Sequence, residues 1–212
     1  LYLYSPAPKD FETMQSFDIK PEDFVATYHG EFTRLGGTDK LVSAILQYTN
    51  ILKEKNIKII LACRVKNEAD RKKKEEISEI IEKNDLEDYV KLPETFTTLE
   101  KVYNLADVVL FPVENMKGKF DIPLVVVEAM ACEKTIIISN LPIFKEFANG
   151  QNSVKIGAGN MEKVFQAVLD VKENPQRYAE IGKNARKFVA ENFDIKKVAE
   201  KYEEVYGSLS VL

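Results

Sequence analysis

Short apolar runs alternate with amphipathic stretches along most of the chain. The apolar runs are rich in Val, Ile, Leu and Phe and predict strands at 24–28, 57–63, 89–92, 108–111, 135–138 and 153–156. Between and after them, apolar residues recur at helical spacing. This spacing predicts helices from Thr38 or Asp39 to Leu52, and at 69–83, 98–105, 124–132, 143–147, 160–171, 175–191 and 194–206.

Strands that are apolar on both faces and alternate with helices indicate a parallel sheet covered on both sides. Right-handed crossovers then give an α/β, doubly wound, Rossmann-like domain. Ligands of such folds bind beyond the carboxyl ends of the strands, so we expect a site among the loops at 29–38, 63–69, 93–98, 112–123 and 139–143. No G-x-G-x-x-G motif follows any predicted strand, which disfavours a nicotinamide-dependent dehydrogenase.

The first twenty residues differ from the rest of the chain. Ser5-Pro6-Ala7-Pro8 is typical of a stiff, extended connection. We interpret residues 1–20 as an interdomain linker or crossing segment, and residues 21–212 as one domain. Because the chain opens at Leu1 without a Met, we expect it to be a fragment of a longer protein.

Composition narrows the class of protein. The 212 residues are 45% apolar and 30% charged, as in ordinary globular domains. The net charge of −4 gives no electrostatic reason to expect a nucleic-acid partner. Cys63 and Cys132 lie inside apolar runs, so we expect buried, reduced thiols in a cytoplasmic protein. No apolar stretch reaches the roughly 18 residues that span a bilayer.

The loop at 112–123 has the most unusual composition. Pro123 suits the first turn of a helix, where its missing N–H costs nothing. The helix N-terminus would present free N–H groups and a positive dipole end near Lys117 and Lys119, which suits phosphate binding. The alternative is a solvated basic loop capped by Asp121.

Glu128 is the one carboxylate in the apolar run 124–132, which we expect to be buried. A buried carboxylate needs hydrogen-bond donors. Ribose hydroxyls of a ligand could supply them, as could backbone N–H groups or a lysine. His29, the only histidine, has no neighbouring set of metal ligands, so no metal site is predicted, and we expect mainly a structural role for it.

Several segments together resemble the donor-binding domain of group-1 (family 4) retaining glycosyltransferases. They are Ala106-Asp107-Val108-Val109-Leu110-Phe111-Pro112, Pro123-Leu124-Val125-Val126-Val127-Glu128-Ala129-Met130-Ala131-Cys132, and the stretches 30–41, 142–150 and 192–206. The likeness runs in the right order through most of residues 20–207.

The resemblance implies the C-terminal half of a two-domain GT-B enzyme. Such an enzyme transfers a hexose from a nucleotide-diphosphate sugar to an acceptor, with retention at the anomeric carbon. Its acceptor-binding N-terminal domain would lie outside this chain. No metal cofactor is implied, because cationic side chains and a helix N-terminus do that work in this architecture. Some relatives act on lipid-linked acceptors, so a membrane-associated acceptor and a location at the membrane periphery are options.

The resemblance also assigns roles to individual residues. Glu128 corresponds to the second of two glutamates and is expected to bind the ribose. The backbone from Asp121 through Ile122, Pro123, Leu124 and Val125 is expected to approach the sugar and the diphosphate. Gly30 opens the first glycine-containing loop, beside the donor.

The sequence departs from the family pattern where charge matters. Phe120 stands where the first glutamate is expected, which leaves Asp121 as the nearest acid and the candidate catalytic carboxylate, with Glu114 as a more distant candidate. Glu31 stands where an arginine is expected, and Gly36 or Gly37 where a lysine is expected. A carboxylate at 31 would repel a diphosphate.

Two explanations of these departures remain open. In the first, the site is rebuilt with cations from other loops, namely Arg34 as the catalytic cation with Arg64, Lys117 and Lys119 as donor-binding groups. In the second, the domain is a non-catalytic interaction module that keeps the fold. The loops at 30–36 and 117–123 would then pack against protein.

Overall fold

A computed structural model describes residues 3–94, 98–117 and 122–209. Within these ranges six strands form one parallel sheet in the order β3-β2-β1-β4-β5-β6. They are β1 (Phe24–Tyr28), β2 (Ile57–Leu61), β3 (Val90–Lys91), β4 (Val108–Phe111), β5 (Ile136–Ser139) and β6 (Val154–Ile156). The prediction of a doubly wound, Rossmann-like sheet is confirmed.

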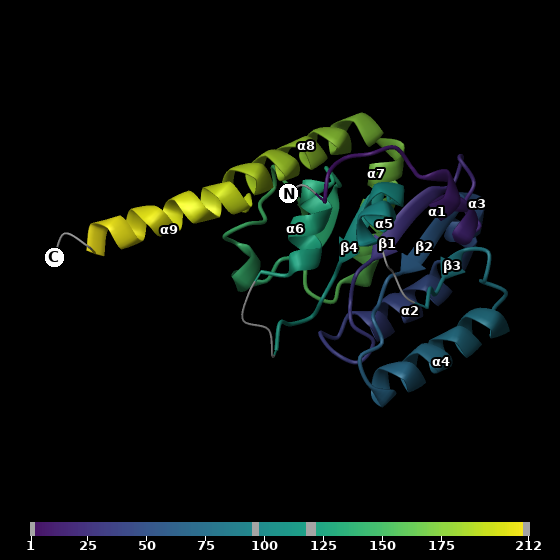
Figure 1. The fold of residues 1–212 in the computed structure, drawn as a ribbon. Coiled ribbons are helices and arrows are strands. Elements are labelled where there is room, and N and C mark those ends of the chain that lie inside the picture. The colour runs from purple at the N-terminus through teal and green to yellow at the C-terminus, as the bar shows by residue number, and fades with distance from the viewer. Residues whose placement is uncertain (1–2, 95–97, 118–121, 210–212) are drawn as a thin grey trace.

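Helices cover both faces of the sheet (Figure 1). The α2, α3, α4 and α7 helices supply one layer of the core, and α1, α5, α6 and α8 supply the other. Their bounds are α1 (Phe11–Ser16), α2 (Thr38–Gln47), α3 (Thr49–Glu54), α4 (Glu68–Lys83), α5 (Leu99–Leu105), α6 (Leu124–Ala131), α7 (Met161–Glu173), α8 (Pro175–Asn192) and α9 (Ile195–Leu209), with a 3₁₀ turn at Pro142–Phe144.

Alternate residues of the central strands pack into the two layers of the core. In β4, Val108 and Leu110 pack into the layer of α2 and α7, whereas Val109 and Phe111 pack into the layer of α6 and α8. All four are buried. Because both faces of the strand are covered, the run is apolar throughout, as expected for a parallel sheet.

The stretch after β1 forms two helices instead of the single helix that its periodicity predicts. The break falls at Tyr48, between α2 and α3. Thr49 Oγ1 donates to the carbonyl of Ile45 at 3.0 Å, so a side chain competes for a helical acceptor at the break. The Tyr48 ring stacks on Phe165 of α7 with centroids 4.7 Å apart, which fixes the bend against the core.

The segment interpreted as a linker lies against the domain. Ala7 N donates to Asn104 Oδ1 at 3.0 Å, and Asn104 Nδ2 donates to the Ser5 carbonyl at 3.0 Å. Residues 11–16 form α1, a helix that the sequence analysis did not predict, capped by Asp10. Met14 of α1 is buried in the core. Whether this segment also connects to another domain stays a prediction.

The chain ends in a helix that leaves the body of the domain. α9 extends away from the sheet (Figure 1). Ile195, Tyr202, Val205 and Tyr206 are all more than half exposed along it. Among the described residues, no helix combines the length and apolarity needed to cross a membrane.

Both cysteines are buried and free, as expected. Burial raises the pKa of Cys63 to about 12 and that of Cys132 to about 11. Neither thiol is therefore a nucleophile near neutral pH.

Candidate functional site

The direction in which strands are added to the sheet reverses between β1 and β4. From β1 the chain proceeds to β2 and β3 on one side, and from β4 it proceeds to β5 and β6 on the other. The carboxyl ends of β1 and β4 therefore form the switch point, where doubly wound folds bind their ligands. The loops that follow these two strands, at 29–38 and 112–123, are two of the five loops singled out from the sequence.

Glycines let the first of these loops fold closely over β1. A Cβ at Gly30 would lie 2.1 Å from Tyr28 Oη, and one at Gly37 would lie 2.7 Å from the same atom. Tyr28 Oη in turn bonds to Thr38 Oγ1 at 3.0 Å, which ties the loop to the first turn of α2. The need for glycine at position 30 is thus explained within the protein, and its contact with a donor stays a prediction.

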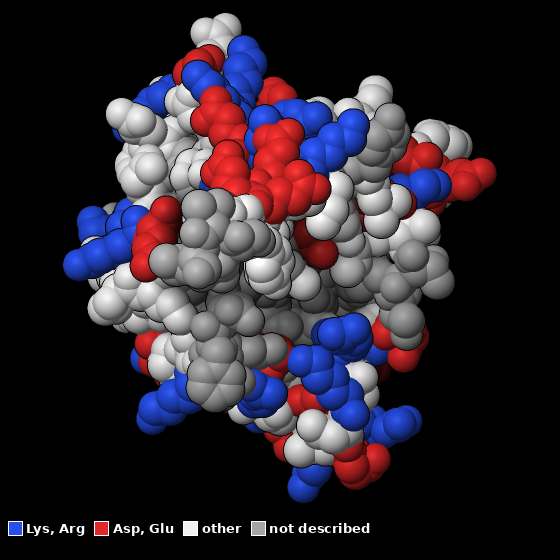
Figure 2. All heavy atoms as spheres, turned by 60° about the vertical axis from the view of Figure 1, so that its left-hand side comes forward, with Lys and Arg blue, Asp and Glu red and all other residues white. Residues whose placement is uncertain are grey.

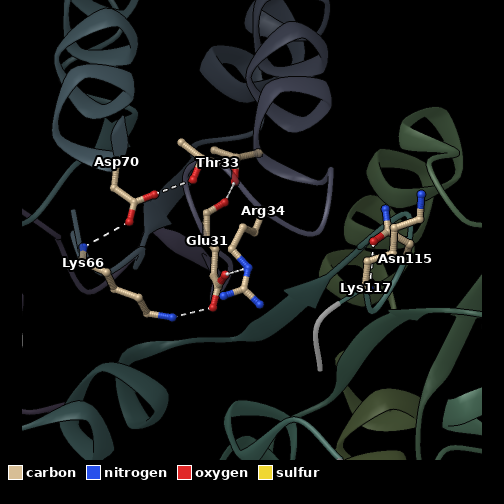
Figure 3. A network of polar contacts seen from close by, with 8 residues as sticks. Glu31, Thr33, Arg34, Lys66, Asp70, Asn115 and Lys117 are labelled. Carbon is tan, nitrogen blue, oxygen red and sulfur yellow. Dashed lines mark hydrogen bonds and ion pairs between the residues drawn. The ribbon is translucent and has the colours of Figure 1, made fainter. Parts of the chain in front are cut away.

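Glu31 is enclosed by two cations (Figure 3). Lys66 Nζ lies 2.5 Å from Glu31 Oε1, and Arg34 Nε lies 3.2 Å from Glu31 Oε2. The Glu31 side chain is 12% exposed, whereas the side chains of Lys66 and Arg34 are 35% and 45% exposed. The acid that the sequence places beside a phosphate site is therefore neutralised by its own neighbours.

A second ion pair occupies the space near Gly36. Lys40 of α2 pairs with Glu114, which follows β4, and Glu114 N donates to the Leu35 carbonyl at 2.9 Å. Gly36 has a φ of +71°, and a Cβ there would lie 2.4 Å from the Glu114 carboxylate. This contact joins the two loops across the switch point.

Glu128 lies on α6 and is half-buried, so the expectation of full burial is wrong. Its Oε2 accepts a hydrogen bond from Tyr103 Oη at 2.9 Å, and Tyr4 also bonds to it. Burial, with the Glu128 charge as the next cause, raises the pKa of Tyr4 to about 12. Two protein donors therefore hold the carboxylate. A carboxylate has about four acceptor positions, so capacity remains for a ligand on its exposed side.

The His29 ring packs against the ring of Tyr103. The two rings stack with centroids 4.4 Å apart, and His29 Nε2 lies 3.1 Å from Thr27 Oγ1. Burial lowers the pKa of His29 to about 3, so the ring is neutral near pH 7. His29 is thus a packing residue beneath the site. Among the described residues, no group of three or more His, Cys, Asp and Glu side chains could hold a metal ion.

The tip of α6 lies at the same edge of the sheet. Pro123 is the N-cap and precedes the helix by one residue, and Val126 N donates to its carbonyl at 2.9 Å. The amides of Leu124 and Val125 therefore come before the helical ladder. Leu124 is 71% exposed, and Ile122, Pro123 and Val125 are partly exposed. Among the described residues, the side chains at this end of the helix are therefore at least partly exposed.

Of the remaining candidate cations, Arg64 and Lys117 are among the described residues. Arg64 follows β2 and is exposed, and Lys117 is exposed beside Asn115, whose Oδ1 accepts from Lys117 N at 3.0 Å. Asp121 and Lys119 lie outside the described residues. Figure 2 shows basic and acidic side chains in neighbouring groups on one face of the domain.

A cavity of about 820 Å³ lies elsewhere, beside the edge strand β3. Ser16 of α1, Ile81 of α4 and Lys91 of β3 are among its lining residues. It is two strands away from the switch point between β1 and β4.

Three residues near the switch point were not among those predicted from the sequence, namely Lys66, Lys40 and Tyr4. Each pairs with a residue from another loop or helix. For Lys66 a signal existed, because it lies in the loop after β2, among the loops expected to hold the site. For Tyr4 no signal existed.

Comparisons with known proteins show the family and the fold of the chain. The family model "Glycosyl transferases group 1" matches residues 9–188, most of the chain, which therefore belongs to this family. No curated protein sequence matches the chain.

Solved structures show the same fold at low sequence identity. HepE from Anabaena in complex with UDP has a TM-score of 0.82 at 20% identity, and the match covers 98% of this chain and 55% of HepE. Sucrose-phosphate synthase from Thermosynechococcus elongatus has a TM-score of 0.78 at 19% identity, covering 99% and 50%. The C-terminal domain of LpcC, a glycosyl transferase group 1 protein from Francisella tularensis, has a TM-score of 0.71 at 16% identity, covering 92% and 97%.

The matches cover different shares of these structures. It spans about half the length of HepE and of the sucrose-phosphate synthase, and nearly the whole of the LpcC domain. The fold is therefore that of one domain in these GT-B relatives.

Proposed function

We propose that this chain is the donor-binding half of a retaining glycosyltransferase and that it binds a nucleotide-diphosphate sugar at the β1/β4 switch point. One observation carries the proposal. The proposal is supported by a half-buried carboxylate on α6, which follows β4, and by cations in the loops after β1 and β2, since ligands of such folds bind beyond the carboxyl ends of the strands.

Each group has a chemical task in this proposal. Glu128 accepts hydrogen bonds from the ribose hydroxyls. The N-terminus of α6, from Ile122 through Pro123, Leu124 and Val125, approaches the diphosphate, whose charge the dipole and the free amides favour. Gly30 lets the β1 loop approach the donor. The proposal needs no metal ion, because cationic side chains lie on the same edge of the sheet.

Catalysis would consist of stabilising the leaving diphosphate. Charge develops on the β-phosphate as the bond to the anomeric carbon breaks, and fixed cations lower the energy of that state. Arg34 is the proposed catalytic cation, with Arg64, Lys117 and Lys119 as further candidates. Asp121 is the proposed acid beside the sugar. Transfer of a hexose with retention follows the family resemblance, and HepE structures that hold UDP and UDP-glucose support the donor class.

The partner in this proposal is an N-terminal acceptor-binding domain of the same protein. HepE is nearly twice as long as the part that matches this chain. Ile195, Tyr202 and Val205 recur at helical spacing along α9 and are 72%, 60% and 56% exposed. Such a stripe suits packing against another domain. We also propose a cytoplasmic location, peripheral to a membrane where the acceptor is lipid-linked.

Calorimetric titration of the chain with UDP, GDP and ADP tests donor binding. We expect at least one of them to bind, with uridine, guanosine or adenosine as the matched control that lacks the diphosphate. The chain alone should not turn over a sugar nucleotide. A folded chain that binds none of the three at millimolar concentration would overturn the proposal.

The second candidate is a non-catalytic interaction module. It is favoured by the pairing of Arg34 with Glu31 and of Lys40 with Glu114, which leaves less positive charge for a phosphate. The same titration separates the two functions, because the module binds no nucleotide.

A further inference from the structure

We propose that Lys66 is a diphosphate-binding residue that acts together with Arg34, and that Glu31 is the internal counterion which the diphosphate replaces. This inference rests on the proposed function. It adds to the proposed site a second cation from the loop after β2, which also contains Arg64.

Glu31, Arg34 and Lys66 form a cluster of three charges. Lys66 and Arg34 approach the Glu31 carboxylate from two elements and contact different oxygens, at 2.5 Å and 3.2 Å (Figure 3). The acid is 12% exposed, but the two cations are about three to four times as exposed, at 35% and 45%. An arriving ligand therefore meets cations first, with the carboxylate behind them.

The backbone of Lys66 is held in place by Asp70. Asp70, in the first turn of α4, is 4% exposed. Its carboxylate accepts from Thr33 Oγ1 at 2.7 Å and from Lys66 N at 3.1 Å, so it joins the β1 loop to the β2 loop. The backbone of Lys66 is fixed relative to Arg34. Less conformational entropy is then lost when its ammonium binds a ligand.

The backbone of Glu31 is fixed by a hydrogen bond from α2. Its carbonyl accepts from Thr38 Oγ1 at 2.6 Å, and Thr38 also bonds to Tyr28 at the end of β1. Glu31 is therefore fixed beside the strand that forms one wall of the switch point. The two cations that it holds lie at the same carboxyl edge of the sheet, where the diphosphate is placed in the proposed function.

The charges of this cluster and of Asp70 affect how it would attract a diphosphate. Arg34 and Lys66 carry two positive charges, and Glu31 and Asp70 carry two negative charges, so these four residues together are neutral. Attraction of a diphosphate then depends on short charge-assisted hydrogen bonds more than on net charge. Neutralising Glu31 would leave these four residues with a net charge of +1 and remove the carboxylate that pairs with Lys66 and Arg34.

The test compares UDP binding by calorimetry for the wild-type chain and the variants Lys66→Met, Glu31→Gln and Lys72→Met, with folding checked by thermal melting. Lys72 is exposed on α4 and serves as the matched control. We expect Lys66→Met to weaken UDP binding about tenfold or more, as for loss of one charge-assisted contact to phosphate. Glu31→Gln should tighten it several-fold, and Lys72→Met should change it less than about twofold.

The outcomes separate this inference from the proposed function. If the folded wild-type chain does not bind UDP, GDP or ADP, the proposed function fails. If it binds a nucleotide but Lys66→Met and Glu31→Gln leave the Kd within twofold, the inference fails and the proposed function stands. If Glu31→Gln weakens binding, Glu31 holds the cations in place and is not a counterion that the diphosphate replaces, which also overturns the inference.

Discussion

The stability of this domain should fall between pH 6.5 and pH 5 because of one residue. His29 is the only histidine in the chain, and it is 3% exposed. Burial lowers its pKa from 6.5 to about 3. Between these two values the unfolded chain binds a proton that the folded chain does not. Acidification through this window therefore stabilises the unfolded state.

The magnitude follows from the same values. Each pH unit within the window costs about 1.4 kcal/mol for one proton. Acidification from about pH 7.5 to about pH 5 should thus lower the free energy of unfolding by about 2 kcal/mol. Carboxylates ordinarily titrate below this range, near pH 4, so the loss between these pH values belongs mainly to His29.

Urea unfolding at a series of pH values measures this loss. The control is His29→Gln, which keeps a polar side chain but cannot titrate. Its free energy of unfolding should change by less than about 0.5 kcal/mol over the same interval, whatever its absolute stability. A wild-type chain whose stability is flat over the interval, or a variant that keeps the full loss, would show that His29 is not held neutral by burial.

Two further predictions concern packing around the site and the core. Tyr103→Phe removes the hydroxyl that donates to Glu128 and should lower the free energy of unfolding by about 1–2 kcal/mol in urea titrations, and it should also weaken nucleotide binding. No change in either would mean that Tyr103 does not position Glu128. Gly182→Ala places a Cβ 2.3 Å from the Glu133 carbonyl and should cost about 1–3 kcal/mol of stability in the same assay, whereas Gly150→Ala, with nothing within 4 Å, should change it by less than about 0.5 kcal/mol. Equal effects of the two glycine variants would contradict the close contact at Gly182.

The sheet could be predicted from the sequence because its signal is local. A buried parallel strand is apolar on both faces, and β1 and β4 begin and end where their apolar runs do. The run at 57–63 overestimates β2, because the chain turns after Leu61 and Cys63 N donates to the Leu61 carbonyl at 2.9 Å. Helix α1 was missed because its six residues are too few to show a period.

The candidate site was only partly predictable, because its charges are paired across loops. Residue types placed Glu31, Arg34 and Glu128 at the carboxyl edge, but not their partners. The pairing of Glu31 with Lys66 spans 35 positions, and that of Glu128 with Tyr103 spans 25. Such contacts depend on how the loops fold, for which a single sequence gives no period or spacing. Glu31 alone would repel a phosphate, but Lys66 and Arg34 pair with its carboxylate and offset its charge.

The most direct test of the account is whether Glu128 holds the ribose. Calorimetry would compare the nucleoside diphosphate that the wild-type chain binds most tightly with its analogue lacking the 2′ and 3′ hydroxyls. Both ligands would be titrated into the wild-type chain, the Glu128→Ala variant and, as a matched control, the Glu203→Ala variant at an exposed position on α9.

We expect loss of the hydroxyls to weaken binding about tenfold or more in the wild type and in Glu203→Ala, since hydrogen bonds to a charged group are lost. In a folded Glu128→Ala variant the same loss should be less than about twofold. An equal loss in all three proteins would contradict the account, because the ribose hydroxyls would then be bound elsewhere.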